Sequence, residues 1–219
     1  MHIILLGAPG VGKGTLAKMI EGKFDIPHLS TGDILRDNVN KKTYVGNQAK
    51  EYMDNGKLVP DDIMIQMVEG RVLEKDCKTG FILDGFPRTI KQAEALKLIF
   101  DELNIVVDAI LNLKASQEII IERLSGRRTC KNCGAIYHIK NIPPKVEDEC
   151  DKCGDRLYQR DDDKKDIVKE RLMVYKTQTK KLISYYKKRD SFCEIDANKK
   201  AGEMFVEVCN CLGKVSKSG

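Results

Sequence analysis

The chain has 219 residues and a formal net charge of +5, and 32% of its residues are charged. This length suffices for one sizeable hydrophobic core with inserted segments. No stretch approaches the roughly 20 apolar residues that a membrane-spanning helix needs, so the sequence argues against a membrane protein. Because acidic and basic residues are interspersed over most of the chain, the modest positive charge does not by itself indicate a nucleic-acid-binding protein.

The first predicted element is a strand at residues 2–6, followed by a glycine-rich loop and a predicted helix at residues 14–24. The loop, residues 7–15, has the sequence GAPGVGKGT. Glycines allow several backbone N–H groups to turn toward a phosphate, and Lys13 adds a positive charge. The helix then directs the positive end of its dipole at the anion. Strand, loop and helix in this order are typical of a P-loop, which binds a nucleoside triphosphate.

Two further inferences follow from this loop. The hydroxyl that usually follows the lysine is replaced by Gly14, with Thr15 one position later, which narrows the choice of family. The loop also lies so near the start of the sequence that a cleaved targeting segment there would remove it. We therefore expect an intracellular, cytoplasmic protein.

Beyond the loop, apolar strands alternate with helical patterns. The strands are continuously apolar, which is typical of a parallel sheet covered on both faces. We therefore predict an α/β fold with three layers: a P-loop core around a central parallel sheet. There is no internal repeat, and no low-complexity tract apart from a short polar tail after Gly213. The further strands are predicted at residues 27–30, 81–84, 106–113 and 192–196, and the further helices at 61–75, 89–100, 116–126 and 164–188.

Two stretches do not follow this alternation. Residues 30–59 contain two short predicted helices with no strand between them. Residues 127–163 contain four cysteines and no long apolar run, so this segment needs a metal as its centre. Both are predicted as insertions, one small and helical, the other zinc-bearing, into a core domain made of residues 1–29, 60–126 and 164–219.

A third motif, DGFPR at residues 84–88, ends a central predicted strand. A carboxylate at the carboxyl edge of a parallel sheet, beside a P-loop, is positioned to hold Mg²⁺ through its water shell, which we predict for Asp84. Arg88 is predicted to clamp a phosphate with its guanidinium group.

More arginines lie at the borders of the two insertions. With Lys13 and Arg88 they form a predicted cage for several phosphates at once. We expect the second and third of them to share one helix face, and the fourth and fifth to face the same way about three helical turns apart. They are Arg36, Arg123, Arg127, Arg160 and Arg171.

The eight cysteines form two groups. Two CxxC pairs, Cys130 with Cys133 and Cys150 with Cys153, are separated by sixteen residues and are each followed by a glycine. They supply four thiolates at the tetrahedral corners that zinc prefers, so we predict a structural zinc site with no open position for catalysis. Two disulfides or a redox dithiol are the alternatives. The nearby His138 is expected at the surface and not as a ligand. The remaining cysteines are predicted to be free thiols: Cys77, Cys193, Cys209 and Cys211.

Together these motifs resemble adenylate kinase, and the four paired cysteines make the chain similar to the long, zinc-bearing form of that bacterial family. The resemblance covers nearly the whole chain, in order. It rests on residues 7–15, Thr31-Gly-Asp33, Asp84-Gly-Phe-Pro-Arg-Thr89, and the run from Arg160 to Asp163 with Arg171.

The resemblance implies reversible, Mg²⁺-dependent transfer of a phosphoryl group from ATP to AMP, giving two ADP, for adenine nucleotide homeostasis. It implies an AMP-binding role for the insertion at 30–59 and a hinged, zinc-bearing lid at 127–163, to which Asp162 and Asp163 belong. It also implies the site residues. The catalytic residues are Lys13, Arg88, Arg127, Arg160 and Arg171. The ATP-binding residues are Gly10, Val11, Gly12, Lys13, Gly14, Thr15, Arg123, Arg127, Ile136, Tyr137 and Lys199. The AMP-binding residues are Thr31, Arg36, Lys57, Leu58, Val59, Gly85, Phe86, Pro87, Arg88, Gln92, Arg160 and Arg171.

Two alternatives stay open at this point. One is a nucleoside monophosphate kinase with another acceptor (UMP, CMP or GMP) or with GTP as donor, although Gln92 and Thr31 are compatible with an adenine edge. The other is a zinc-ribbon nucleic-acid-binding protein, disfavoured because the cysteine segment has only two tyrosines and balanced charges. We expect ATP, AMP and ADP as partners, no nucleic acid and no membrane. Since no long apolar face suggests a dimer, we also expect a monomer.

Overall fold

The computed structural model describes residues 1–215, without the side chains of residues 214 and 215, so most of the polar tail lies outside the described residues. The strands are β1 (His2–Gly7), β2 (His28–Ser30), β3 (Phe81–Asp84), β4 (Ala109–Lys114), β5 (Arg127–Cys130), β6 (Ile136–His138), β7 (Leu157–Tyr158) and β8 (Phe192–Asp196). The α-helices are α1 (Lys13–Phe24), α2 (Thr31–Asn40), α3 (Tyr44–Asp54), α4 (Asp61–Val72), α5 (Ile90–Glu102), α6 (Gln117–Ser125), α7 (Lys165–Val174), α8 (Lys180–Tyr186) and α9 (Ala201–Val215). Two 3₁₀ turns, η1 (Lys75–Cys77) and η2 (Asp161–Asp163), and a π-helical segment, η3 (Tyr175–Thr179), complete the elements.

Five strands form one parallel sheet in the order β2-β3-β1-β4-β8, which confirms the predicted α/β fold. The central strand β1 pairs with β3 on one side and with β4 on the other. The chain passes from β1 to the edge strand β2, returns to β3, and then crosses to β4 and β8 on the other side of β1. The crevice that binds ligands in such sheets lies at the carboxyl ends of the strands, where the strand order changes direction. The P-loop follows β1 at that edge.

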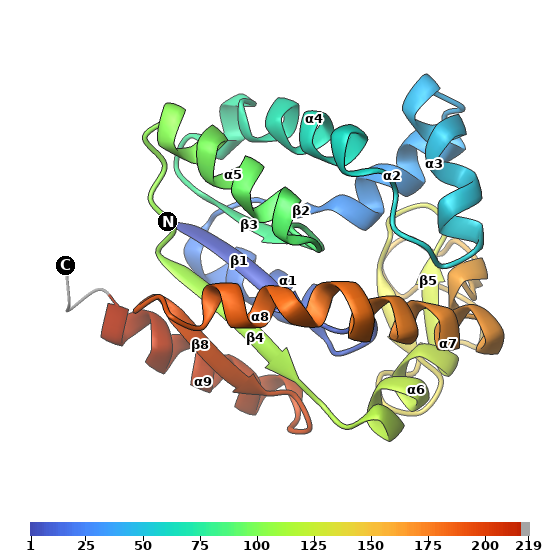
Figure 1. The fold of residues 1–219 in the computed structure, drawn as a ribbon. Helices are drawn as coiled ribbons and strands as arrows, with labels where there is room; N and C mark the ends of the chain where they lie inside the picture. The colour runs from blue at the N-terminus through green and yellow to red at the C-terminus, as the bar shows by residue number, and fades with distance from the viewer. Residues whose placement is uncertain (216–219) are drawn as a thin grey trace.

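Successive side chains of β1 enter two different hydrophobic clusters, because side chains alternate between the faces of a sheet. Ile4 and Leu6 pack with α4, α5 and α8 on one face. Ile3 and Leu5 pack with α1 and α9 on the other. Figure 1 shows the resulting three layers of helices, sheet and helices.

The two predicted insertions have different structures. Residues 30–59 contain α2 and α3, as predicted; Ser30 caps α2 by accepting a hydrogen bond from the Asp33 N–H, and Thr43 caps α3. Within residues 127–163, β6, β5 and β7 form a small antiparallel sheet. Both segments lie beyond the carboxyl ends of the strands of the central sheet (Figure 1).

Three predicted elements differ from the structure by three or more residues at one end or are interrupted; the other boundaries agree within two residues. The strand predicted from residue 106 begins at Ala109, because residues 106–108 pack against the start of β1 as a loop. The helix predicted over 61–75 ends at Val72. The helix predicted over 164–188 is interrupted by the π-helical segment η3, which separates α7 from α8.

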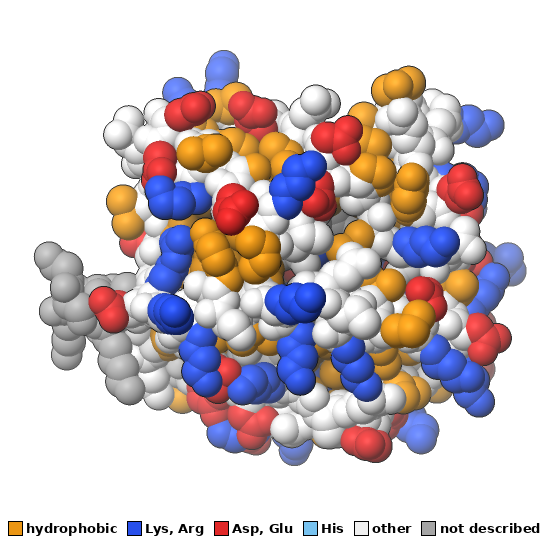
Figure 2. All heavy atoms as spheres, in the orientation of Figure 1, with side chains coloured by type: hydrophobic (Ala, Val, Ile, Leu, Met, Phe, Trp, Pro, Cys, Tyr) orange, Lys and Arg blue, Asp and Glu red, His pale blue; other side chains and the backbone are white. Residues whose placement is uncertain are grey.

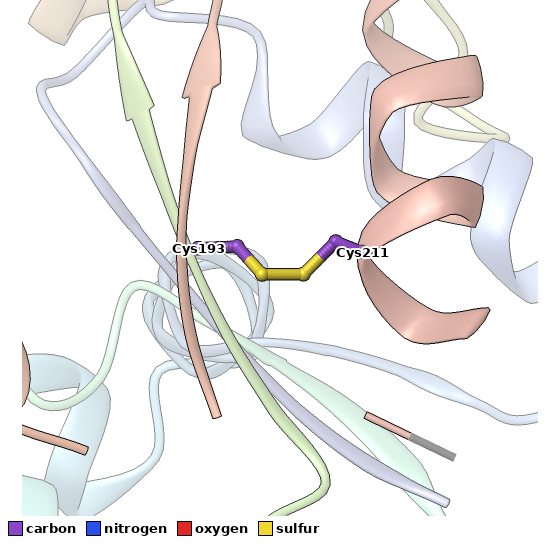
Figure 3. The surroundings of a disulfide bond; sticks show 2 residues. All are labelled: Cys193 and Cys211. Atoms are coloured by element: carbon purple, nitrogen blue, oxygen red, sulfur yellow. A yellow bond between two sulfur atoms is a disulfide. The ribbon is translucent and has the colours of Figure 1, made fainter. Parts of the chain in front are cut away.

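Two predictions about the thiols are wrong. Cys193 on β8 and Cys211 on α9 form a disulfide and are not free (Figure 3). The pair is 18 residues apart, and α9 packs beside β8 so that the Cα atoms are 6.6 Å apart, within the range that a disulfide bridges. Cys77 and Cys209 are free, as predicted.

His138 is buried and not at the surface, which corrects another prediction. Its Nε2 lies 3.1 Å from the carbonyl oxygen of Glu122, in the last turn of α6, and its Nδ1 accepts hydrogen bonds from two backbone N–H groups. The ring lies against Gly126, where an added Cβ would stand only 2.3 Å from Nε2. His138 therefore joins β6 to the end of α6, outside the group of four cysteines that could hold a metal ion.

None of the described helices is long and apolar enough to cross a membrane. On the face drawn in Figure 2, Lys and Arg side chains are interspersed with Asp and Glu, as expected from the sequence.

Candidate active site

A cavity of about 730 Å³ lies at the carboxyl edge of the sheet, and its walls come from the P-loop, both insertions and the loop before α9. Of the residues predicted to bind substrate or magnesium, all line this cavity except Val11 and Phe86. Those two are fully buried in the clusters on the two faces of the sheet. The side chains that the sequence predicted to surround several phosphates thus line a single cavity.

Lys13 lies half-buried at the start of α1. Its ammonium donates hydrogen bonds to the carbonyl oxygens of Gly7 (2.9 Å) and Ala8 (3.1 Å). Burial lowers the pKa of Lys13 to about 8, and Asp84 opposes the effect while nearby arginines add to it. A phosphate at this position would favour the charged lysine.

Packing leaves no room for a side chain at Gly10 of the P-loop. Its φ is +77°, and an added Cβ would stand 2.4 Å from Leu124 Cγ on α6. Arg123, also on α6, donates through Nη1 to the carbonyl oxygens of Val11 and Ala197, at 2.9 and 2.8 Å. α6 therefore holds the P-loop against the loop that follows β8.

Asp84 and Arg88 lie on the next strand-to-helix connection, after β3. Asp84 accepts a hydrogen bond from His28 Nε2 at 3.2 Å. Burial raises the pKa of Asp84, but His28 and Lys13 outweigh burial and leave it below its ordinary value. Arg88 is half-buried, and its Nε donates to the carbonyl oxygen of Gly85 at 2.7 Å. Burial and the neighbouring Arg171 lower the pKa of Arg88 to about 10.

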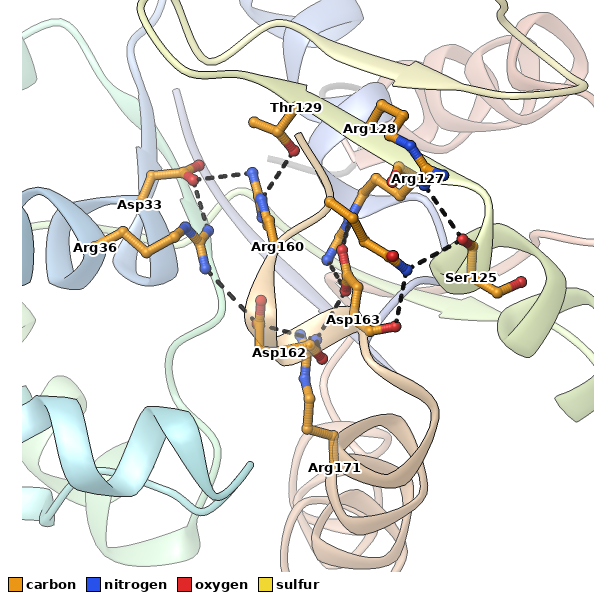
Figure 4. A network of polar contacts seen from close by, with 11 residues as sticks. Asp33, Arg36, Ser125, Arg127, Arg128, Thr129, Arg160, Asp162, Asp163 and Arg171 are labelled. Atoms are coloured by element: carbon orange, nitrogen blue, oxygen red, sulfur yellow. Dashed lines mark hydrogen bonds and ion pairs between the residues drawn. The ribbon is translucent and has the colours of Figure 1, made fainter. Parts of the chain in front are cut away.

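Four arginines and three aspartates form a network across the cavity (Figure 4). Asp163 is the most buried member, and it accepts hydrogen bonds from Arg127 (2.7 Å) and Arg171 (3.2 Å). Asp162 lies 3.0 Å from Arg171 and 3.9 Å from Arg36.

The two insertions meet in this network. Asp33, at the start of α2, accepts hydrogen bonds from Arg36 (2.6 Å) and from Arg160 of the cysteine-bearing segment (3.4 Å). Burial raises the pKa of Asp33, but these two arginines outweigh burial and leave it well below its ordinary range. Arg160 also donates to Thr129 at 3.0 Å. Its pKa is lowered to about 10 by burial and by Arg36.

The predicted positions of these arginines along the chain are partly wrong. α6 ends at Ser125, so Arg127 lies on β5 and not on a helix face shared with Arg123. Arg160 precedes η2 in an extended conformation, so it does not share a helix with Arg171. All four side chains still reach the cavity, because β5 and η2 lie beside the start of α7 (Figure 4).

Gln92, near the start of α5, is almost completely buried at the cavity wall. Its Oε1 accepts a hydrogen bond from the backbone N–H of Arg88, and its Nε2 donates to Asp61; both distances are 2.7 Å. Thr31 donates to the carbonyl oxygen of Asp84 at 3.1 Å.

The four paired cysteines form a cysteine cluster: Cys130, Cys133, Cys150 and Cys153. Their sulfurs all lie within 4.8 Å of one another, and the closest pairs are 3.4 and 3.5 Å apart. Zinc–sulfur bonds of about 2.3 Å place the sulfurs of a tetrahedron about 3.8 Å apart, so the cluster fits one zinc ion. Gly134 and Gly154 follow the two turns with φ of +66° and +72°, a backbone region that favours glycine.

Sequence reasoning gave no role to several residues that position the predicted ones. Asp33 belongs to the Thr31-Gly-Asp33 motif. Its ion pair with Arg160 depends on contact between residues 30–59 and 127–163, which the sequence alone does not show. The other such residues are His28 against Asp84, Asp61 against Gln92, and Thr129 against Arg160. For Asp61 the sequence offered one signal, its place as an acidic residue at the start of a predicted helix.

Comparison with known proteins gives a consistent result. The family model described as "Adenylate kinase" matches residues 5–191. The adenylate kinase of Clostridium tetani is 53% identical over 216 residues, which cover 99% of this chain and 100% of that protein. Those of the archaea Archaeoglobus fulgidus and Methanocella arvoryzae are 50% and 49% identical, over 98% and 99% of this chain and 99% and 100% of their own lengths.

Proposed function

Since this chain belongs to the adenylate kinase family and is an ATP:AMP phosphotransferase, we propose that its cavity holds ATP and AMP end to end, with the transferred phosphoryl group between Lys13 and the arginines. The observation that carries this proposal is that Lys13, Arg88 and five further arginines line one cavity and come from separate elements. Phosphoryl transfer needs little covalent chemistry from the protein, and positioning and positive charge supply most of the catalysis.

On the ATP side, the P-loop and Lys13 bind the phosphates, and Arg127 meets the group that is transferred. Arg123 stacks on the adenine, in keeping with its position between the P-loop and the loop after β8. The other ATP contacts are Gly10, Val11, Gly12, Gly14, Thr15, Ile136, Tyr137 and Lys199. Val11, whose side chain lies in the core, contributes only through its backbone.

On the AMP side, Arg36 and Arg88 bind the α-phosphate, and Gln92 faces the base. The remaining AMP contacts are Thr31, Lys57, Leu58, Val59, Gly85, Phe86 and Pro87, of which Phe86 acts through its backbone because its side chain is buried in the core. Arg160 and Arg171 contact the phosphates of both nucleotides.

The aspartates of the network give these arginines partners while the cavity contains no phosphates. Asp33 and Asp162 face Arg36, Arg160 and Arg171 from the two insertions. Phosphates that enter the cavity compete for the same guanidinium groups. Closure of the segment 127–163 over bound nucleotides excludes water, which is the competing acceptor.

Two metals are part of the proposal. Asp84 is a buried carboxylate at the cavity wall, which suits Mg²⁺, because this ion binds through one or two carboxylates, several waters and substrate phosphates. When bound, Mg²⁺ neutralises phosphate charge. The cysteine cluster holds zinc, whose four protein ligands stabilise the 127–163 lid and take no part in the reaction. We further propose that the protein is a cytoplasmic monomer, that residues 30–59 are the AMP-binding part, and that the core comprises 1–29, 60–126 and 164–219.

Replacing Arg88 with alanine tests the phosphate clamp. We expect kcat/KM for AMP to fall by about 10²–10³, the usual cost of removing one charged donor at a transition state. Arg128→Ala is the matched control, because Arg128 follows Arg127 on β5, its guanidinium donates to the backbone carbonyls of Ser125 and Arg127, and among the described residues it is not part of the cavity lining. Steady-state kinetics with a coupled assay for ADP, together with thermal unfolding, measure both variants. Full activity of Arg88→Ala would refute the clamp.

A further inference from the structure

The side-chain amide of Gln92 is held at both ends. The backbone N–H of Arg88 can only donate, so the atom that faces it at 2.7 Å must be the amide oxygen. The carboxylate of Asp61 can only accept while it is ionised, so the atom that faces it at 2.7 Å must be the amide nitrogen. A rotation of the amide by 180° would set donor against donor and acceptor against acceptor. The orientation therefore follows from the contacts themselves.

Asp61 is itself fixed in place. It is the first residue of α4, and both of its carboxylate oxygens lie 3.2 Å from the hydroxyl of Thr89, which donates to them. The same hydroxyl caps α5 by accepting a hydrogen bond from the backbone N–H of Gln92 at 3.1 Å. The amide, the carboxylate and the cap thus form one closed set of hydrogen bonds that joins α4 to α5.

Besides these two contacts, and within residues 1–215, the held amide keeps one acceptor site on Oε1 and one N–H on Nε2 for a further partner. This pair complements a base that presents an amino donor beside a ring-nitrogen acceptor, as adenine does with its 6-amino group and N1. Guanine and hypoxanthine present the reverse pattern, a 6-oxo acceptor beside an N1–H donor. Such a base would need the rotated amide, which the contacts with Arg88 and Asp61 oppose.

We infer that Asp61 is a positioning residue that, with the Arg88 backbone N–H, locks the Gln92 amide so that the acceptor pocket favours 6-amino over 6-oxo purine monophosphates. This inference rests on the proposed contact between Gln92 and the AMP base. It assigns to the α4–α5 junction a part in choosing the substrate, in addition to its packing.

The test compares AMP with inosine 5′-monophosphate, which differs from AMP only in carrying the 6-oxo, N1–H pattern. In Asp61→Asn, the new side-chain amide can donate through its NH₂ to the oxygen of a rotated Gln92 amide. The contact at residue 61 then no longer opposes the rotation, and only the contact with the Arg88 N–H does. We expect the ratio of kcat/KM for AMP to that for inosine monophosphate to fall at least about tenfold, with kcat/KM for inosine monophosphate rising in absolute terms. KM for ATP stays within about twofold of wild type.

The matched control is Asp62→Asn, which removes the same charge from the same first turn of α4 at an exposed position. We expect it to leave the ratio unchanged. Both acceptors are measured on one preparation, so a partly unfolded sample lowers both rates equally and does not alter the ratio. If Asp61 had only a structural role, Asp61→Asn would lower kcat/KM for AMP and for inosine monophosphate together. It would not raise kcat/KM for inosine monophosphate.

A third variant separates failure of this inference from failure of the proposed function. If Gln92→Ala changes the ratio but Asp61→Asn does not, Gln92 contacts the base and the lock by Asp61 is refuted. If Gln92→Ala also leaves the ratio and KM for AMP unchanged, the proposed position of the AMP base is wrong, and the inference falls with it.

Discussion

Lys13 shows how burial tunes one residue for its ligand. Its ammonium lies among Arg88, Arg127 and Arg171, with Asp84 as the opposing charge, and burial holds its pKa at about 8. Triphosphate oxygens supply the compensating negative charge that the free protein lacks at this point. Binding should therefore raise the pKa of Lys13 above its value in the free protein.

This gives a pH dependence with a definite sign. Below pH 8 Lys13 is charged in the free protein, and above pH 8 it must take up a proton to bind the phosphates in its charged form. ATP affinity should therefore fall by up to about tenfold for each pH unit between pH 8.5 and 9.5, with net proton uptake on binding. Calorimetric titrations with ATP at pH 7.5, 8.5 and 9.5 measure both. Lys13→Arg is the control, since arginine stays charged over this pH range. If ATP affinity fell equally with pH in both proteins, the dependence would not come from titration of Lys13.

Among the elements, the antiparallel sheet β6-β5-β7 has the smallest core. The described part of its cluster contains five buried residues, two of which are zinc-ligand candidates: Cys130, Ala135, Tyr137, Cys150 and Leu157. We therefore expect a segment with so little apolar burial to depend on the proposed zinc for its stability. The arginines at its two ends, Arg127 and Arg160, reach the cavity only while this segment is folded.

Removal of zinc should therefore lower stability and activity together. We expect a chelator, or Cys133→Ser, to lower the Tm by at least about 5 °C, since each kcal/mol shifts the Tm of a chain of this size by about 2–4 °C. Phosphoryl transfer should fall in parallel. Cys209→Ser, a free thiol outside the cluster, is the control and should change neither. In Cys211→Ser, which lacks the disulfide between β8 and α9, thermal unfolding that responds to reductant but not to chelator would instead indicate two disulfides within the cysteine cluster.

The disulfide between β8 and α9 acts on a different element. It closes a loop of 18 residues, for which the chain-entropy model gives about 3 kcal/mol of stabilisation. Cys211→Ser should lower the Tm to the value of the reduced wild-type protein and leave kcat unchanged, because the bond lies away from the cavity-lining start of α9. Thermal unfolding with and without reductant measures this, again with Cys209→Ser as control. A reductant-sensitive Tm in Cys211→Ser would assign the stabilisation to other thiols.

At the scale of the whole molecule, the sequence predicts the helices, strands and P-loop more reliably than the contacts between them. Continuous apolar strands and the glycine loop have local signatures, so the parallel sheet and the P-loop are confirmed at nearly the predicted positions. α6 ends at Ser125, and His138 packs on Gly126, a contact that no local sequence pattern shows. The placement of Arg127 on a helix and of His138 at the surface was wrong at this junction between α6 and the cysteine-bearing segment.

The site follows the same division. Residue type and order predicted which arginines belong to the cavity, since each lies at an insertion border. Pairing across insertions, such as Asp33 with Arg160, joins residues 127 positions apart and depends on how the segments fold over the sheet. The disulfide was missed for a related reason: a reducing compartment argues for free thiols, whereas the packing of α9 on β8 decides which sulfurs meet.

The central claim is that the cavity aligns two nucleotides for transfer between them and excludes water. Incubation with ADP as the only nucleotide, in the presence of Mg²⁺, tests it most directly, with ATP, AMP and inorganic phosphate quantified over time by ³¹P NMR. The account predicts ATP and AMP in equal amounts with almost no phosphate. Phosphate released in place of ATP, or no conversion of ADP at all, would contradict it.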